Sequence, residues 1–268
     1  MVGGVALVAL IPAGAATATT AAAAPQVSAP HVVVHSPFAA GLRHERTNGT
    51  VESTNWGGYA AQDSAKFTEV QGTWVQPTST CSSRTDQYAA FWVGIDGYSS
   101  DSVEQIGTDS DCDGVNKPNY YAWYEMYPSA SVELSPSSYP VKPGQTITGK
   151  VSVSGSNFTL TITNGSWTFS TTQSGSGLAQ SSAEWIAESP EICSRTCTLA
   201  QLADFGTVGF TNSDAEVTGQ SSPQPISSFT YDGGPQEIIC ETSNGTVRDE
   251  PSALGSGGNN FTITWKHD

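Results

Sequence analysis

The chain has 268 residues and is strongly acidic, with 25 Asp and Glu residues against 10 Lys and Arg and a formal net charge of −15. Beyond residue 50 the basic residues are scattered along the chain, so they offer no basic patch to a phosphate backbone or an anionic membrane surface. We therefore expect neither nucleic acid nor a membrane as a partner. At low pH, protonation of the carboxylates leaves few cations to repel one another, which favours tolerance of acid.

Residues 1–24 have the composition of a secretory signal peptide. The apolar run Val5–Ile11 leads into the small residues Ala21–Ala24, which matches an apolar core followed by an A-x-A cleavage pattern. A transmembrane helix is the alternative, but Pro12 and Gly14 interrupt the run, which falls short of the roughly 18–20 residues needed to span a bilayer. The prediction is a secreted, extracellular protein, in a compartment that permits disulfides.

Residues 25–50 are the basic part of this acidic chain. Against the lone Glu45, this segment carries His31, His35, Arg43, His44 and Arg46. It is either a short linker or a propeptide held by charge to the acidic body that follows. Histidines gain charge over a range in which carboxylates lose it, so the sequence does not give the sign of the effect of acid on such a contact. Residues 51–268 show no internal repeat, and we expect them to form a single domain.

Five cysteines follow the predicted signal peptide, and their odd number means that at least one does not pair within the chain: Cys81, Cys112, Cys193, Cys197 and Cys240. Cys193 and Cys197 can close a small loop, which leaves Cys81 with Cys112 as the simplest second pair. A zinc site is the alternative. The spacing of Cys193 and Cys197 is loose for zinc, however, and no histidine lies nearby to complete four ligands, so we expect no metal.

From Asn55 to the C-terminus the sequence is typical of β-strands. Apolar and polar residues alternate in three clear stretches, residues 151–154, 158–163 and 261–265. Asn164–Gly165 stands between two of the expected strands, which is a strong hairpin signal. Only Leu199–Phe205 favours a turn or two of helix. Many short alternating strands with polar turns predict an all-β fold, a single antiparallel sandwich or barrel.

The distribution of histidine excludes several catalytic mechanisms. His267, in the C-terminal tail, is the only histidine beyond residue 50, so the body lacks the imidazole base of Ser-His-Asp or Cys-His catalysis and the usual ligands of catalytic zinc. The sequence also has no Gly-rich phosphate loop and no Asp-Thr/Ser-Gly signature. Acid–base chemistry is therefore left to carboxylates surrounded by amides and aromatic rings, and we expect no cofactor.

Carboxylates, amides and aromatic rings concentrate in three regions: residues 91–97 followed by 104–109, residues 120–128, and residues 182–188. Alternate residues of a strand share a face. This alternation predicts three sets that each share a face: Gln105, Gly107 and Asp109; Trp92, Gly94 and Asp96; and Trp123, Glu125 and Tyr127. Taken alone, each region also fits a sandwich core with hydrogen-bonded carboxylates at the strand ends.

Several motifs, taken in chain order, resemble one known family. They are Asn55–Tyr59, Gly72–Pro77, Phe91–Gly97, Gln105–Asp109, Tyr121–Pro128 and Ala183–Ile186. Together they resemble the glutamic peptidases, the eqolisin family of fungal acid proteases, and particularly their bacterial relatives. The resemblance covers roughly Asn55 to Phe210, and the Cys193/Cys197 pair is more similar to the bacterial branch than to the fungal one.

The resemblance implies a two-sheet antiparallel β-sandwich, with a concanavalin-like arrangement, that cleaves proteins in acid with a Gln/Glu dyad. The family glutamine falls on Gln105, in a Gln-x-Gly-x-Asp context, and the family glutamate falls on Glu184, in Ala-Glu-Trp-Ile. Met126 departs from the aromatic residue that relatives often carry there, which concerns the substrate subsites and not the dyad. The residues that match the surrounding shell are Trp92, Asp96, Asp109 and Glu125.

The residue types fit this chemistry independently of the resemblance. A glutamate acts as a general base only while it is ionised, so activity in acid requires Glu184 to keep its charge at low pH, which a hydrogen bond from Gln105 would favour. We expect Glu184 to take a proton from water and later pass it to the leaving nitrogen, while Gln105 donates to the developing oxyanion. Asp96 and Asp109 are expected to orient or tune the dyad, whereas Glu125 also fits a purely structural role.

Two other classes of function fit parts of the pattern. A lectin-like, carbohydrate-binding sandwich without turnover would use exposed aromatic rings, for which Trp92, Trp123 and Trp185 are candidates. A glycoside hydrolase would use Glu184 with a second carboxylate, Glu125 or Asp109, and would not need an amide beside them. The function predicted from the sequence is a monomeric, secreted acid endopeptidase that acts on protein or peptide substrates.

Overall fold

The structure, a computed structural model, describes Met1 and residues 32–38, 45–46, 49–242 and 244–268. The predicted signal peptide and most of the basic segment 25–50 lie outside the described residues. Among the described residues, no helix is long and apolar enough to cross a bilayer.

Twenty strands and two short 3₁₀ helices make up the regular structure of the described residues. In chain order they are β1 (Val32–Val34), β2 (Glu45–Arg46), β3 (Thr50–Ser53), β4 (Trp56–Gln62), β5 (Phe67–Val75), β6 (Ala90–Ile95), β7 (Val103–Cys112), β8 (Pro118–Tyr127), β9 (Val132–Glu133), β10 (Thr146–Ser154), β11 (Asn157–Thr163), β12 (Thr168–Ser174), β13 (Ser182–Glu188), β14 (Glu191–Cys193), β15 (Cys197–Leu199), β16 (Thr207–Val217), β17 (Gln224–Pro225), η1 (Ile226–Ser228), η2 (Tyr231–Gly233), β18 (Gln236–Glu241), β19 (Val247–Pro251) and β20 (Phe261–Trp265).

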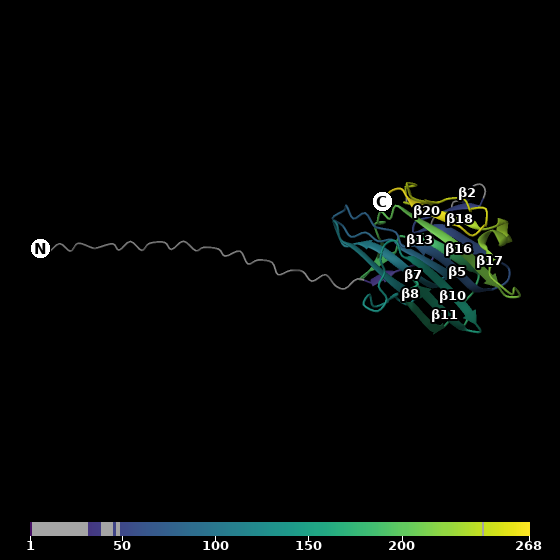
Figure 1. The fold of residues 1–268 in the computed structure, drawn as a ribbon. Helices are drawn as coiled ribbons and strands as arrows, with labels where there is room; N and C mark the ends of the chain where they lie inside the picture. Colours follow the sequence, from purple (N-terminus) through teal and green to yellow (C-terminus); the bar gives the residue numbers. More distant parts are fainter. Residues whose placement is uncertain (2–31, 39–44, 47–48, 243) are drawn as a thin grey trace. The chain divides into compact units, whose positions relative to one another are not determined.

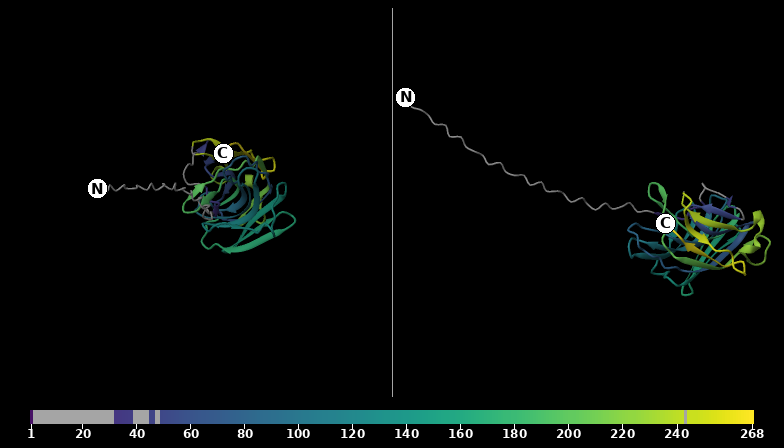
Figure 2. Two further views of the ribbon diagram at one scale, coloured as in Figure 1. Left: turned by 90° about the vertical axis from the view of Figure 1, so that its left-hand side faces the viewer. Right: turned by 90° about the horizontal axis from the view of Figure 1, so that it is seen from above.

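The longer strands form two antiparallel layers that pack face to face (Figures 1 and 2). One layer, called the site layer below, has the neighbour order β8–β7–β6–β13–β4–β18. The back layer has the order β12–β11–β10–β5–β16–β20. β19 pairs with both β18 and β20, so the hydrogen-bond ladder continues from one layer to the other. The predicted two-sheet antiparallel sandwich is confirmed.

The space between the layers is filled by apolar side chains from alternate strand positions. Val93, Ile106 and Trp185 of the site layer are fully buried in one cluster with Trp74 and Phe210 of the back layer. The rings of Trp74 and Phe210 lie 5.7 Å apart. Burying a large apolar side chain contributes about 1.5–3 kcal/mol, so this cluster is the main source of stability.

The opposite face of the site layer is buried as well. β6, β7 and β13 contain no exposed residue on either face. A second apolar cluster on this outer face joins Trp56, Trp92, Trp123 and Ile186 to Phe38, which comes from the segment that precedes the sandwich. Buried carboxyl and amide groups stand among these rings, and the outer face therefore carries the candidate site.

Of two local predictions from the sequence, the hairpin is confirmed and the helical turn is wrong. β11 and β12 form the hairpin predicted at Asn164–Gly165, with Thr163 opposite Thr168. The helical turn expected at Leu199–Phe205 is wrong, because the backbone there pairs with Tyr88 instead: Tyr88 donates to the carbonyl of Gln201 at 2.9 Å and accepts from Ala203 at 3.0 Å.

The cysteine pairing agrees with the simplest arrangement that the sequence allowed. Disulfides join Cys81 to Cys112 and Cys193 to Cys197. Cys240 is the unpaired cysteine, and it is buried. Both cysteines of the loosely spaced pair are therefore committed to a disulfide and are not available as zinc ligands.

Candidate active site

The two residues predicted to form the dyad lie in one row across the site layer. In the strand register, Glu184 of β13 stands opposite Gly94 of β6, and Gly94 stands opposite Gln105 of β7. Residues opposite one another in neighbouring strands share a face, so Glu184 and Gln105 project to the same side with Gly94 between them. Two strand spacings separate their backbones by about 10 Å, a gap that two long side chains approach from both ends.

Gly94 keeps the space between the two side chains open. A Cβ atom at this position would lie 2.9 Å from the ring of Trp92 and 3.2 Å from the Cβ of Gln105. Both distances are shorter than ordinary van der Waals contact, so even an alanine would crowd the row. Steric crowding by Trp92 and Gln105 therefore favours glycine at position 94.

The other predicted shell residues on β7 and β8 share this face. Gln105 stands opposite Glu125, Gly107 opposite Trp123, and Asp109 opposite Tyr121. Trp92 of β6 lies in the same row as Gly107. The alternation read from the sequence thus places Trp92, Asp109 and Glu125 around the dyad row as predicted.

Glu184 is fully buried, and neither of its carboxyl oxygens forms a hydrogen bond with a described residue. Burial raises the pKa of Glu184 well above its usual value, and the charges of Asp96 and Glu104 act in the same direction. The Ser182 hydroxyl and the Tyr98 backbone oppose this rise without reaching normal hydrogen-bond geometry. In this state of the chain the Glu184 carboxyl group is desolvated and lacks hydrogen-bond donors, so its ionised form is disfavoured.

Gln105 hydrogen-bonds to a peptide carbonyl and not to Glu184 as expected. Its Nε2 donates to the backbone oxygen of His35 at 2.6 Å, while its Oε1 has no partner among the described residues. The carbonyl comes from the basic segment that precedes the sandwich, 70 residues earlier in the chain. The side-chain amide thus holds a main-chain carbonyl in the way expected for a bound substrate.

The side chain of His35 is held by the other residues of this face. Its ring stacks on Trp123 with the centroids 3.5 Å apart and the planes 1° from parallel. Nδ1 lies 2.9 Å from a carboxyl oxygen of Glu125, which also accepts the His35 backbone N–H at 3.0 Å, and Nε2 lies 3.6 Å from Asp109. Burial lowers the pKa of His35, but Asp109 and Glu125 outweigh it and raise the pKa to about 10. The imidazole is therefore a buried cation between two carboxylates.

Asp109 is fixed by two aromatic side chains in addition to the histidine. Trp123 donates from Nε1 to one carboxyl oxygen at 2.6 Å, and the Tyr121 hydroxyl donates to the other at 2.8 Å. The same hydroxyl lies 2.9 Å from Asp111. Asp109 consequently orients the ring of Trp123, on which the His35 imidazole rests.

Asp96 has a different position from the other predicted shell residues. It follows the end of β6 with a φ of 72°, in the left-handed region, which takes it out of the strand register. Its carboxyl group accepts hydrogen bonds from the backbone N–H groups of Gln180 at 2.7 Å and Ser181 at 2.8 Å. Asp96 thereby anchors the turn that leads into β13, the strand that carries Glu184.

Two residues of the site were not among the candidates from the sequence. Glu188 is fully buried and accepts a hydrogen bond from Trp92 Nε1 at 2.8 Å, which fixes that ring. Tyr121 links Asp109 to Asp111, as described above. Alternation along β13 places Glu188 on the face of Glu184, and this periodicity was the signal that would have identified it.

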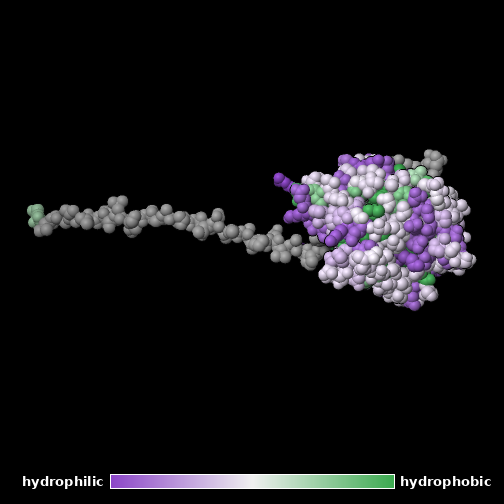
Figure 3. Space-filling model, in the orientation of Figure 1, coloured by the Kyte–Doolittle hydropathy of each residue, from purple (hydrophilic) through white to green (hydrophobic). Residues whose placement is uncertain are grey.

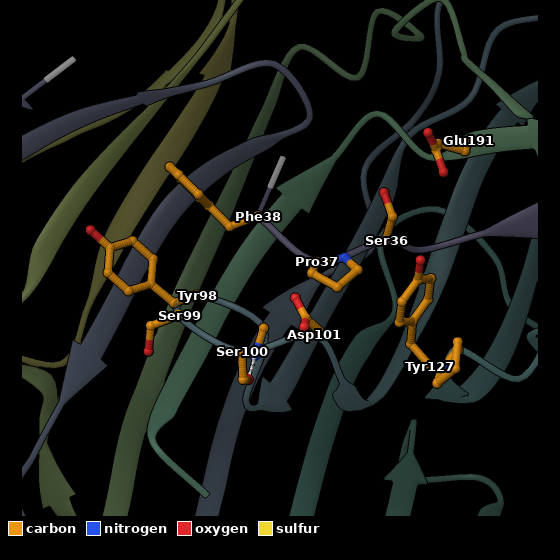
Figure 4. A pocket seen from close by; sticks show the side chains of 11 residues that line it. Ser36, Pro37, Phe38, Tyr98, Ser99, Ser100, Asp101, Tyr127 and Glu191 are labelled. Carbon is orange, nitrogen blue, oxygen red and sulfur yellow. Dashed lines mark hydrogen bonds between the residues drawn. The ribbon is translucent and has the colours of Figure 1, made fainter. Parts of the chain in front are cut away.

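A pocket of about 640 Å³ lies along the preceding segment at Ser36, Pro37 and Phe38 (Figure 4). Ser36 and Pro37 run through the middle of this pocket, with Tyr98 and Phe38 at one end and Tyr127 and Glu191 at the other. This part of the preceding segment therefore lies in a groove whose lining includes neither Glu184 nor Gln105.

The chain matches known sequences over most of its length. Residues 54–263 match the Peptidase A4 family. The chain is 30% identical to Aspergillopepsin-2 from Aspergillus niger over 231 residues, which cover 74% of this chain and 78% of that protein. It is 35% identical to Scytalidopepsin B from Scytalidium lignicola over 184 residues, which cover 64% of this chain and 66% of that protein.

Solved structures agree with the sequence matches. A crystal structure of scytalido-glutamic peptidase with a transition state analog inhibitor has a TM-score of 0.67 and 25% identity, covering 80% of this chain and 98% of that one. The structure of aspergilloglutamic peptidase from Aspergillus niger has a TM-score of 0.55 and 30% identity, covering 67% and 99%. The chain therefore belongs to the Peptidase A4 family and is a glutamic endopeptidase.

Proposed function

We propose that the protein is a secreted acid endopeptidase in which Glu184 is the general base and acid and Gln105 stabilises the oxyanion. The observation that carries this proposal is the 2.6 Å hydrogen bond from the Gln105 side chain to a main-chain carbonyl, in the row that also contains Glu184. A donor already placed on a peptide carbonyl is what stabilisation of the tetrahedral intermediate requires.

Each step of the mechanism is assigned to a side chain of the row. Ionised Glu184 takes a proton from water, and the water oxygen bonds to the carbonyl carbon of the substrate. Gln105 Nε2 donates to the oxygen as it becomes negative. Glu184 then gives its proton to the departing nitrogen as the C–N bond breaks, and it returns to the ionised form.

The segment that lies in the groove supports a propeptide role for residues 25–50. While residues 32–38 lie across the outer face, the Glu184 carboxyl group is buried and its pKa is raised, which disfavours the ionised form that acts as a base. Loss of the segment would bring water to Glu184 and lower that pKa towards its usual value. We propose that the chain is made as an inactive, secreted zymogen and that its active form is a monomer.

Two finer assignments belong to the same proposal. Asp96 and Asp109 act as positioning residues, through the β13 turn and the Trp123 ring respectively. Placement in the bacterial branch of the family is supported by the Cys193–Cys197 disulfide, whereas the relatives compared above are fungal.

Carbohydrate binding without turnover is the second candidate from the sequence, and the geometry disfavours it. Trp185 is fully buried and points into the core between the layers, and the Nε1 groups of Trp92 and Trp123 are bound by Glu188 and Asp109 within the site layer. The face seen in Figure 3 is mostly neutral to hydrophilic, and no tryptophan is among the exposed large hydrophobic residues of the described chain. A sugar-stacking platform needs such exposed rings.

The test is digestion of denatured haemoglobin from pH 2 to pH 7 by the processed protein, with Glu184→Ala and Gln105→Ala as variants. Gln173→Ala on β12 and Glu250→Ala on β19 are matched controls, because both residues lie outside the site layer. We expect peptide release in acid for the wild type and both controls, and its loss in both site variants. No release from folded, processed protein at any pH would reject the enzyme assignment, and release that persists in the site variants would reject the dyad.

A further inference from the structure

The segment Val32–Phe38 lies across the site layer in the manner of a bound peptide. Its upstream half is a strand: β1 pairs antiparallel with β14, with Val33 opposite Ile192 and Val34 opposite Glu191. The Ser131 hydroxyl also donates to the Val33 carbonyl at 2.8 Å. The residues before His35 are therefore fixed by strand addition, a common mode of peptide recognition.

The downstream half is fixed by different residues. Asn55 donates from Nδ2 to the carbonyls of Ser36 at 3.2 Å and Pro37 at 3.1 Å, and Trp56 Nε1 donates to the Ser36 carbonyl at 3.0 Å. The Phe38 backbone N–H bonds to the Gly97 carbonyl at 3.1 Å.

The side chain of Phe38 also anchors this half. Its ring lies 5.9 Å from that of Trp56 and 5.1 Å from that of Tyr98, at the end of the pocket in Figure 4. Both halves of the segment are thus held, and the His35–Ser36 peptide bond joins the two halves.

The residue at the centre of the segment meets the catalytic row. The carbonyl of His35 is the acceptor of Gln105 Nε2, while its imidazole is enclosed by Trp123, Glu125 and Asp109. The next two carbonyls, of Ser36 and Pro37, are bound by Asn55 and Trp56 and not by the proposed oxyanion donor. Of the peptide bonds in this segment, only the one that follows His35 is presented to Gln105.

We propose that the His35–Ser36 peptide bond is the bond that the enzyme cleaves in its own chain, an inference that rests on the proposed function above. Water adds to the His35 carbonyl carbon while Glu184 takes its proton. The bond to the Ser36 nitrogen then breaks, and Glu184 returns the proton to that nitrogen. The products are a peptide that ends in the carboxylate of His35 and a mature chain that begins with the amino group of Ser36.

The chemistry of the segment explains why this bond is selected. The site around the residue before the cut combines an aromatic face with two carboxylates, which suits a cationic ring such as protonated imidazole. The following bond, Ser36–Pro37, has proline as the leaving nitrogen, and its carbonyl is turned to Asn55 and Trp56. The same features predict that in other substrates the enzyme favours histidine or another cationic side chain immediately before the cleaved bond.

The experiment follows the purified, uncut chain after transfer from neutral to acid pH, by intact mass and N-terminal sequencing. The variants are Glu184→Gln, His35→Ala and His267→Ala, each checked for folding by thermal unfolding, and casein digestion is measured in parallel. We expect the wild type to acquire Ser36 as its N-terminus and Glu184→Gln to stay intact. His35→Ala should cut at this bond at least about tenfold more slowly, which corresponds to losing about 1.4 kcal/mol of binding. His267→Ala, which changes an exposed histidine of the tail, should match the wild type.

Three results would overturn the inference, and they differ in what they say about the proposed function. If the wild type digests casein but its new N-terminus lies elsewhere, or the chain stays intact, the self-cleavage site is wrong and the peptidase assignment stands. If Glu184→Gln also begins at Ser36, another protease makes the cut. If the wild type cleaves neither casein nor itself, the proposed function fails and the inference fails with it.

Discussion

The two faces of the site layer use the same strands for opposite purposes. On the face toward the back layer, Ile106 and Trp185 are buried among apolar side chains. On the outer face their sequence neighbours, Gln105 and Glu184, are equally buried but carry amide and carboxyl groups without full hydrogen bonding. Burying such groups costs free energy, whereas burying the apolar ones releases it. Burial of apolar side chains on the inner face therefore offsets the free-energy cost of burying the polar side chains of the site on the outer face.

The largest contrast is expected between two adjacent substitutions, Gln105→Ala and Ile106→Ala. Gln105→Ala removes the donor to the carbonyl, so the turnover rate should fall by about 10²–10³ with little change in stability. Ile106→Ala removes a fully buried side chain from the core, so the free energy of unfolding should fall by about 2–5 kcal/mol while turnover below the unfolding temperature is retained. Peptide hydrolysis and denaturant unfolding of the processed enzyme measure the two effects.

The reverse result would remove the distinction between the faces. If Gln105→Ala unfolded the protein as readily as Ile106→Ala, its lost activity would report structural damage and not catalysis. A variant outside both faces, Gln173→Ala, provides the baseline for both measurements.

The substitution Gly94→Ala examines the space between Glu184 and Gln105. The added methyl group would meet the Trp92 ring at 2.9 Å and the Gln105 Cβ at 3.2 Å. Overpacking of this kind costs about 1–3 kcal/mol, and here it should also lower the turnover rate because Gln105 must shift.

Gly155→Ala, at a β10–β11 turn with open space around it, is unsuitable as a control because its φ of 64° would add strain. Gly209→Ala on β16 is better, since its nearest neighbour would lie at 3.9 Å. Equal activity of Gly94→Ala and Gly209→Ala would show that the gap is not needed.

The fold followed from local features of the sequence, whereas the state of the site did not. Alternation placed Trp92, Gln105, Asp109 and Glu125 on the correct face, because the side-chain period of a strand is two wherever the strand lies. The hairpin at Asn164–Gly165 followed equally from local turn chemistry.

The contacts of the dyad depend on a segment expected to lie outside the domain. Gln105 hydrogen-bonds to the backbone of His35, 70 residues away, and Glu125 binds the side chain of the same residue. Charge and alternation can indicate that residues 25–50 meet the acidic body, but not which carbonyl reaches which amide. The rings of Trp92 and Trp123 are buried for the same kind of reason, since the outer face is covered by Phe38 and its neighbours.

Burial of carboxyl groups gives a pH dependence of stability. Burial, and then the charge of Asp96, raises the pKa of Glu104 from 4.5 to about 9, and burial raises that of Asp249 from 3.8 to about 8. A carboxyl whose pKa is raised on folding adds stability that is fully present below its unfolded pKa and is lost as the pH rises through the folded value. The sandwich should therefore unfold at a lower temperature at pH 9 than at pH 4.5.

Replacing one of these carboxyl groups by its neutral isostere separates this effect from general charge repulsion. Glu104→Gln should reduce the difference in stability between pH 4.5 and pH 9 by at least about 1 kcal/mol, since each pKa unit corresponds to about 1.36 kcal/mol. Glu216→Gln, at a partly exposed carboxyl on β16, should leave the difference unchanged. Thermal unfolding across this range measures both variants. An unchanged pH profile for Glu104→Gln would mean that this carboxyl group is not desolvated in the folded protein.

The most subtle difference concerns the histidine that the outer face encloses. In uncut Glu184→Gln protein, the His35 imidazole should titrate near pH 10 and not near 6.5, because Asp109 and Glu125 outweigh its burial. A histidine whose pKa is raised on docking favours the docked segment fully below pH 6.5, and this contribution is lost as the pH rises through about 10. Imidazole NMR signals followed from pH 5 to pH 11 measure the titration, and Glu125→Gln should move it toward 6.5. A titration near 6.5 in the parent would mean that His35 is not held between the two carboxylates. Acid release of the segment would then have to depend on groups other than the cluster of His35, Glu125 and Asp109.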